Sequence, residues 1–280
     1  MSRFVLPGLY ALFVWWFSTG VIILLDNLPV RTFRWSMAAG TVLFAASLHG
    51  LWTTGGDTSL AGAYAAFTCA VLAWGWQEMS FFMGYVTGPR RHGCTADCGG
   101  ARHFWHGVQA CLHHELAILA TAAAILGLTW GAPNQVGLWT FLLLWAMRQS
   151  AKLNFFLGVL NLGEQFLPPH LGYLRSFMRR KPMNLLMPVS VTGGTVVATI
   201  LVQHASAPGV DEVQAAGLSF LITMLVLAVV EHWVLVLPLP FEKLWSWVLR
   251  WRRPGAGWLP SSARRAAPAR APSPPGMKPV

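Results

Sequence analysis

Apolar residues run through this chain in long blocks that polar residues seldom interrupt. Seven blocks approach or exceed the roughly 20 mostly apolar residues that a membrane-spanning helix needs, and none alternates with the period of two that barrel strands show. The blocks are Phe4 to Leu25, Ser36 to Thr53, Leu60 to Met83, His106 to Trp130, Val136 to Leu160, Met187 to His204 and Ala215 to Leu237. The pattern predicts an all-α, polytopic membrane bundle of about seven transmembrane helices.

Basic residues gather in alternate connections between these blocks. The first, third and fifth loops and the C-terminal tail hold all but three of the 20 Lys and Arg residues, and the other loops hold none. Short loops rich in Lys and Arg stay in the cytoplasm. We therefore expect a multi-pass membrane protein whose N-terminus lies outside and whose C-terminus lies in the cytoplasm.

Composition supports a chain built for lipid, because 55% of its 280 residues are hydrophobic and only 11% are charged. The net charge of +10 follows from the basic loops, and no compact basic region with interleaved aromatics indicates nucleic-acid binding. From Arg253 onward the chain consists mainly of Pro, Ala, Arg and Ser, which cannot bury enough apolar surface to fold. The predicted domains are a transmembrane domain over residues 1–252 and a disordered basic cytoplasmic tail over residues 253–280.

Ionisable residues inside the apolar blocks form the candidate functional site, because an unpaired charge in a bilayer costs several kcal/mol. The apolar run from Leu116 to Trp130 covers only about 22 Å at 1.5 Å per residue, so the residues before it must enter the membrane. Arg148 and Lys152 are four residues apart and share a helix face, which needs acids opposite. The predicted polar layer, in the cytoplasmic half of the bilayer, comprises Glu78, His113, His114, Glu115, Arg148, Lys152, Glu231 and His232.

This layer has two interpretations: it fixes the register of the helices, as polar groups do in membrane bundles, or it binds a ligand. A di-iron centre is disfavoured, because it uses Glu-x-x-His pairs on one helix face, whereas His114-Glu115 and Glu231-His232 are adjacent and diverge by about 100°. A tetrapyrrole that holds magnesium or iron fits better, since it needs one axial imidazole in an apolar slot, which His113, His114 or His232 could supply. The residues identify no catalytic group.

A second candidate site lies in the third loop. Cys94 and Cys98 stand in the segment HGCTADCGGARH, with His92 and His103 nearby. Thiolates and imidazoles bind zinc, and a cytoplasmic location disfavours a disulfide. A single CxxxC spacing is a weaker signal for metal than two paired ligand sets.

Several segments together resemble a known family. They are ALFVWWFSTG, RTFRWSM, AFTCAVLAWGWQEMSFFMGYVTGPRR, HHELAI, GAPNQVGLWTF, RQSAKLNFFLGVLNLGEQFLP, RRKPMNLLMPVSVT and EHWVLVLPLPF. The chain is similar over about residues 8 to 250 to the PuhE family, photosynthetic complex assembly protein 2 of anoxygenic phototrophic bacteria. The basic tail lies outside this resemblance.

The resemblance implies an integral membrane assembly factor for the photosynthetic reaction centre and light-harvesting complex, acting also on bacteriochlorophyll supply or delivery. It implies reaction-centre and light-harvesting subunits and membrane lipids as partners, bacteriochlorophyll or a precursor as the ligand, and no requirement for enzymatic activity. It also implies a location in the bacterial inner membrane, cytoplasmic or intracytoplasmic, with a periplasmic N-terminus. It supplies no catalytic residues. The residues also leave open a membrane-bound enzyme of pigment or lipid metabolism that uses the intramembrane His and Glu residues as acid, base or metal ligands.

Overall fold

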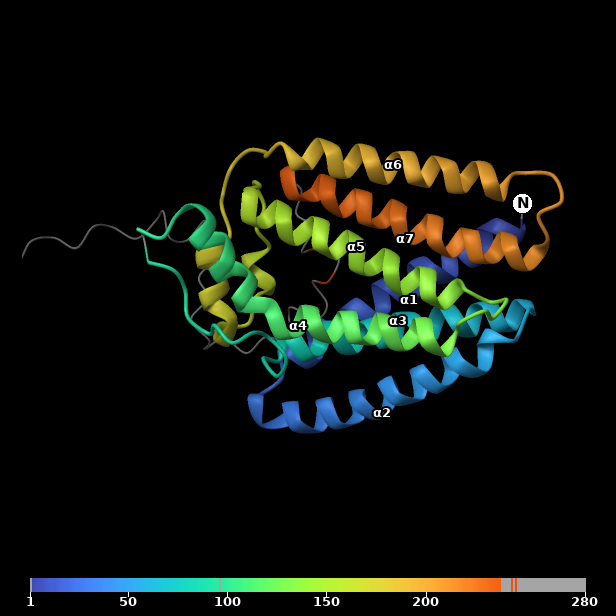
Figure 1. The fold of residues 1–280 in the computed structure, drawn as a ribbon, viewed down its shortest axis with the longest axis horizontal. Coiled ribbons are helices and arrows are strands. Elements are labelled where there is room, and N and C mark those ends of the chain that lie inside the picture. The colour runs from blue at the N-terminus through green and yellow to red at the C-terminus, as the bar shows by residue number, and fades with distance from the viewer. Residues whose placement is uncertain (1, 96, 238–242, 244, 246–280) are drawn as a thin grey trace, which may run out of the picture.

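The computed structural model describes residues 2–95, 97–237, 243 and 245 and shows a bundle of long helices (Figure 1). The predicted tail, 253–280, lies outside these residues. Two 3-10 helices, η1 (Glu164–Phe166) and η2 (Pro169–Phe177), follow the fifth α-helix. The α-helices are α1 (Ser2–Asp26), α2 (Val30–Gly55), α3 (Leu60–Phe82), α4 (Gly100–Leu128), α5 (Val136–Leu157), α6 (Leu186–Ala205) and α7 (Glu212–Val236).

The all-α prediction is confirmed for the described part of the chain, which contains no β-strand and only an isolated bridge between Val159 and Arg180. Each predicted apolar block coincides with one helix. The largest differences are at the starts of α2 and α4, which begin six residues before the predicted blocks, at Val30 and Gly100.

Four helices, α1, α4, α6 and α7, are long and apolar enough to cross a membrane by length and composition. They make the protein a candidate multi-pass membrane protein. Helices α2, α3 and α5 are not in this set, and in α5 the polar side chains gather between Arg148 and Asn154. That they also span the membrane, and that the N-terminus is periplasmic, stay predictions.

Helix α3 is the centre of the bundle and packs against α1, α2, α4, α5 and α7. Four buried alanines on it, Ala63, Ala66, Ala70 and Ala73, let neighbouring helices approach closely. Its Phe67 stacks on Phe220 of α7, with ring centroids 4.6 Å apart. Helix α6, in contrast, packs mainly on α7, at the edge of the bundle.

Successive helices alternate in direction, so the α3–α4 loop and the α5–α6 connection lie at one end of the bundle, opposite the start of α1 (Figure 1). Both belong to the basic set of connections. The α5–α6 connection packs against the helices on either side of the α3–α4 loop, because Leu171, Leu174 and Phe177 of η2 form a cluster with Phe81 of α3 and Ala110 of α4. This end is therefore a folded layer.

The α3–α4 loop crosses α4 and bends it. The main-chain N–H of His114 donates to Thr87 O (2.9 Å), and the N–H of Arg90 donates to Gln109 O (3.4 Å). Hydrogen-bond partners inserted beside a helix produce such bends, and the first turns of α4 run at an angle to the rest (Figure 1). The contact of the loop with His114 lies immediately before Glu115.

The loop can cross α4 this closely because Gly88 has no side chain, and a substitution there tests the crossing. A Cβ at Gly88 would lie 2.6 Å from the carbonyl carbon of Ala110 and 2.8 Å from its oxygen. Gly88→Ala should therefore destabilise the protein by about 1–3 kcal/mol, as overpacking does, measured by denaturant unfolding of the purified protein in detergent.

Gly99 of the same loop is the matched control, because a Cβ there has no described atom within 4 Å. Gly99→Ala, at the N-cap of α4, should change stability by less than about 1 kcal/mol. Equal losses in the two variants would show that the crossing does not depend on the missing side chain.

Candidate functional site

Two ion pairs join α5 to α3 and α4. Arg148 Nη2 lies 2.8 Å from Glu78 Oε2 of α3, and Lys152 Nζ lies 2.5 Å from Glu115 Oε1 of α4. Gln149 donates a further hydrogen bond to Glu115. The four charged side chains keep only 12 to 27% of their exposure, so water screens their attraction weakly. One face of α5 thus binds two helices.

His232 connects α5, α6 and α7. Its Nε2 lies 2.8 Å from Ser150 Oγ, which donates to Ser190 Oγ at 2.9 Å. The other ring nitrogen, Nδ1, lies 2.8 Å from Ala228 O. Because both nitrogens are hydrogen bonded and the residue is buried, His232 is a structural connection.

His114 differs from His232 in having no polar partner. It is fully buried against Phe81, with ring centroids 4.6 Å apart, and neither ring nitrogen has a hydrogen-bond partner among the described residues. A neutral imidazole carries one donor and one acceptor, and each unsatisfied buried group costs about 1–3 kcal/mol. The His114 imidazole is therefore a buried polar group whose hydrogen-bonding capacity the described residues leave unused.

The remaining predicted members have different surroundings. Glu231 of α7 is half-buried, receives a hydrogen bond from Trp15 of α1, and lies within electrostatic range of Arg148 and Glu78. His113 is exposed on α4 and does not join the layer. The adjacent His113 and His114 thus point to different environments, as their angular separation on a helix requires.

Two members of the layer were not predicted. Asp26, at the end of α1, has a buried Oδ1 without a partner in the described residues and lies within electrostatic range of Glu78. Gln77 is fully buried and donates to Thr121 Oγ1 of α4 at 2.7 Å. Asp26 falls just outside the predicted apolar block, and Gln77 is neutral, so a search for charges within blocks finds neither.

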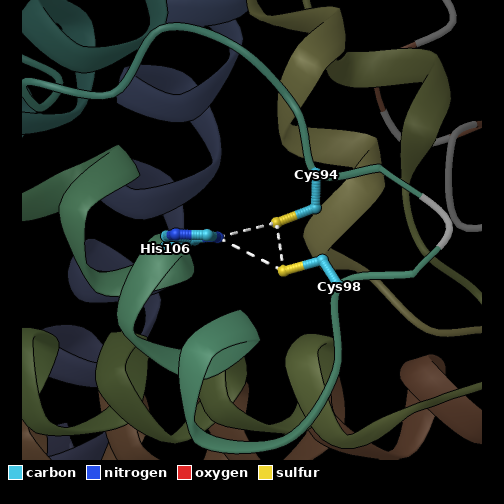
Figure 2. Close-up of side chains that lie close together, drawn as sticks. All are labelled: Cys94, Cys98 and His106. Atoms are coloured by element: carbon cyan, nitrogen blue, oxygen red, sulfur yellow. Dashed lines mark hydrogen bonds between the residues drawn. The ribbon is translucent and has the colours of Figure 1, made fainter.

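Cys94 and Cys98 of the α3–α4 loop meet His106 of α4 (Figure 2). The two Sγ atoms are 3.2 Å apart, and each lies 3.3 Å from His106 Nδ1. Burial, followed by the neighbouring Cys98 thiol, raises the pKa of the Cys94 thiol. The three side chains can donate to one metal ion.

The imidazole in this cluster is His106 rather than either predicted histidine. His103 is buried near Phe156 and Phe177, at ring-centroid distances of 5.3 and 5.6 Å. His92 is in the loop but outside the three-residue cluster. The sequence pattern places His106 at the start of an apolar block rather than in the loop, so the CxxxC segment alone does not identify it as a ligand.

The comparisons with known proteins cover nearly the whole helical region. A family described as "Protein of unknown function (DUF3623)" matches residues 1–256. An uncharacterized 30.4 kDa protein in the puhA 5' region of Rhodobacter capsulatus is 38% identical over 248 residues, which cover 87% of this chain and 90% of that protein. No solved structure matches the chain significantly.

The Arg148–Glu78 pair can be tested by a double-mutant cycle. Glu78→Leu or Arg148→Leu alone leaves a shielded charge unpaired and should destabilise the protein by about 3 kcal/mol, whereas the double variant should recover most of that loss. Unfolding in detergent measures all four proteins.

The exposed pair between Arg180 and Glu164, with side chains 63% and 39% exposed, is the matched control. Its coupling energy should be below about 1 kcal/mol. Additive effects at Glu78 and Arg148 would contradict an energetic coupling between them.

Proposed function

The chain belongs to the DUF3623 family of proteins of unknown function, and we propose that it is an integral membrane assembly factor for the photosynthetic reaction centre and light-harvesting complex. The proposed location is the bacterial inner membrane. Three observations support it: the resemblance to the PuhE family, the relative whose gene region is named for puhA in a photosynthetic bacterium, and the apolar helices.

The unpartnered imidazole of His114 is the observation that most directly supports pigment binding. Bacteriochlorophyll carries a magnesium ion that accepts one axial nitrogen ligand, and the protein supplies the ligand and its orientation. His114 offers such a nitrogen beside the apolar face of Phe81. His232 does not, because both of its nitrogens are engaged.

Charged neighbours of His114 could form hydrogen bonds with the polar edge of a tetrapyrrole ring. Glu115 and Lys152 pair one residue away and keep about a fifth of their side-chain exposure, so the pair reaches the surface of the bundle. From there it can accept and donate hydrogen bonds while its net charge stays zero, which limits its cost in lipid. The proposed docking surface is therefore the junction of α4 and α5.

The α3–α4 loop contacts the main chain of α4 at His114. Thr87 of that loop accepts the main-chain hydrogen bond of His114, and the imidazole itself is fully buried. Docking of a ligand thus requires the loop and α4 to separate locally. A carrier that holds pigment or a nascent subunit only transiently needs such a reversible opening.

The pigment content of two variants distinguishes the role of His114 from that of its neighbour His113. The wild-type chain, purified in mild detergent from a phototrophic bacterium, should carry bacteriochlorophyll, and His114→Leu should lose most of it because the axial nitrogen is gone. The absorption spectrum of the purified protein measures this. His113→Leu is the control, since His113 is exposed.

An absence of pigment from the wild-type protein, or equal loss in both variants, would contradict His114 as its ligand. Stoichiometric iron together with turnover of a pigment precursor would instead favour a membrane enzyme.

Assembly activity depends on the acids of the layer. In a phototrophic bacterium lacking its own family member, the wild-type chain should restore the photosynthetic complexes, and Glu115→Gln or Glu231→Gln should lower their amount at least about twofold, because charges inside a membrane are functional by default. Reaction-centre and antenna absorption, normalised to the amount of this protein, measures the effect.

Glu212→Gln, in the exposed first turn of α7, is the matched control for Glu231→Gln. Normal antenna absorption in the Glu115 and Glu231 variants would exclude the polar layer as the functional site.

A further inference from the structure

Three soft or borderline metal donors converge on one point at the end of the bundle that carries the basic loops. We propose that Cys94, Cys98 and His106 bind a Zn²⁺ ion that fastens the α3–α4 loop to the first turns of α4 (Figure 2). Thiolate and imidazole are the ligands that Zn²⁺ prefers in proteins. The site does not depend on the proposed function.

The distances suit a tetrahedral ion after a small adjustment. With Zn–S bonds of about 2.3 Å and a Zn–N bond of about 2.0 Å, tetrahedral angles separate the two sulfurs by about 3.8 Å and each sulfur from the nitrogen by about 3.5 Å. The observed separations are 3.2 Å and 3.3 Å. The donors therefore need to open by only about 0.2–0.6 Å, which a loop cysteine can do.

Contacts around the cluster hold each cysteine in place from a different element. The N–H of Cys94 donates to Ser176 Oγ of η2 at 2.9 Å, and Arg90 Nη2 donates to Gly93 O at 3.2 Å. Arg102, in the first turn of α4, donates to Asp97 O at 3.4 Å, next to Cys98. Outer partners of this kind orient metal ligands.

Charge also favours a metal here. Two thiolates and one Zn²⁺ are together neutral, so the ion removes the repulsion that two adjacent thiolates otherwise have. A disulfide would use the cysteines alone and give His106 no role.

Three protein ligands leave a fourth tetrahedral position. All three residues are half-buried, so this position can be reached from the surface and be completed by water, as in zinc sites with an exchangeable ligand. The same loop carries Thr87 and Gly88, which cross α4 beside His114. Metal binding should therefore hold the loop that contacts the main chain at His114.

The full-length protein, reduced and stripped with a chelator in detergent, tests the site. Titration with Co²⁺ should give one ion per chain, with thiolate charge-transfer absorption and the intense visible bands of a tetrahedral ion, and Zn²⁺ should displace it. Cys94→Ser and Cys98→Ser should each weaken binding by more than the roughly 10–100-fold that loss of an outer partner costs.

Matched controls come from the same chain. Cys69→Ser and Cys111→Ser, which lie outside the cluster, should bind Co²⁺ like the wild type. His106→Gln should weaken binding, and His103→Gln, next to Phe156, should not. The proposal is overturned if the wild-type chain binds no Co²⁺, if the control variants lose as much affinity, or if Cys94 and Cys98 form a disulfide in the metal-free protein under the reducing conditions used.

Discussion

Charges that are shielded from water are costly unless they are paired, and in this bundle two such pairs fix how three helices meet. Helix α5 carries Arg148 and Lys152 one turn apart. Their ion-pair partners are Glu78 of α3 and Glu115 of α4. Sliding any of these helices by one residue would separate a pair at a cost of several kcal/mol. Apolar packing alone, between side chains that resemble lipid, sets register much less firmly.

The second constraint is the main-chain crossing of the α3–α4 loop over α4. The crossing leaves no room for a side chain at Gly88 and places Thr87 against the backbone of His114. The loop continues to Cys94 and Cys98, which return to α4 one or two turns before the bend. A single loop therefore contacts both candidate sites, the polar layer at His114 and the cluster of Cys94, Cys98 and His106. A change in the position of this loop would affect both.

Much of the helical fold could be predicted, because apolar blocks of sufficient length leave a chain few alternatives to helices. The polar partners of those helices were harder to predict. The expected depth of each residue in the bilayer places Glu115 and Lys152 at the same level. It does not distinguish His114 from His232, because the difference lies in the hydrogen-bond partners of His232, Ser150 on α5 and Ala228 one turn earlier on α7. His106 was hidden for another reason: α4 starts earlier than its apolar run, so its first turns are chemically part of the loop.

The two buried histidines differ in how their ring nitrogens are used, and ligand binding is proposed for only one of them. Both ring nitrogens of His232 are hydrogen bonded, to Ser150 of α5 and Ala228 of α7, and so help to hold the helices together. His114 contributes none of its polar capacity to the described residues, and a bundle that needed only cohesion would be more stable with an apolar side chain there. A buried imidazole that costs stability is more simply explained by a ligand than by packing. The ion pairs beside it then hold α3, α4 and α5 in register around that imidazole, which is the rigid support that a binding site requires.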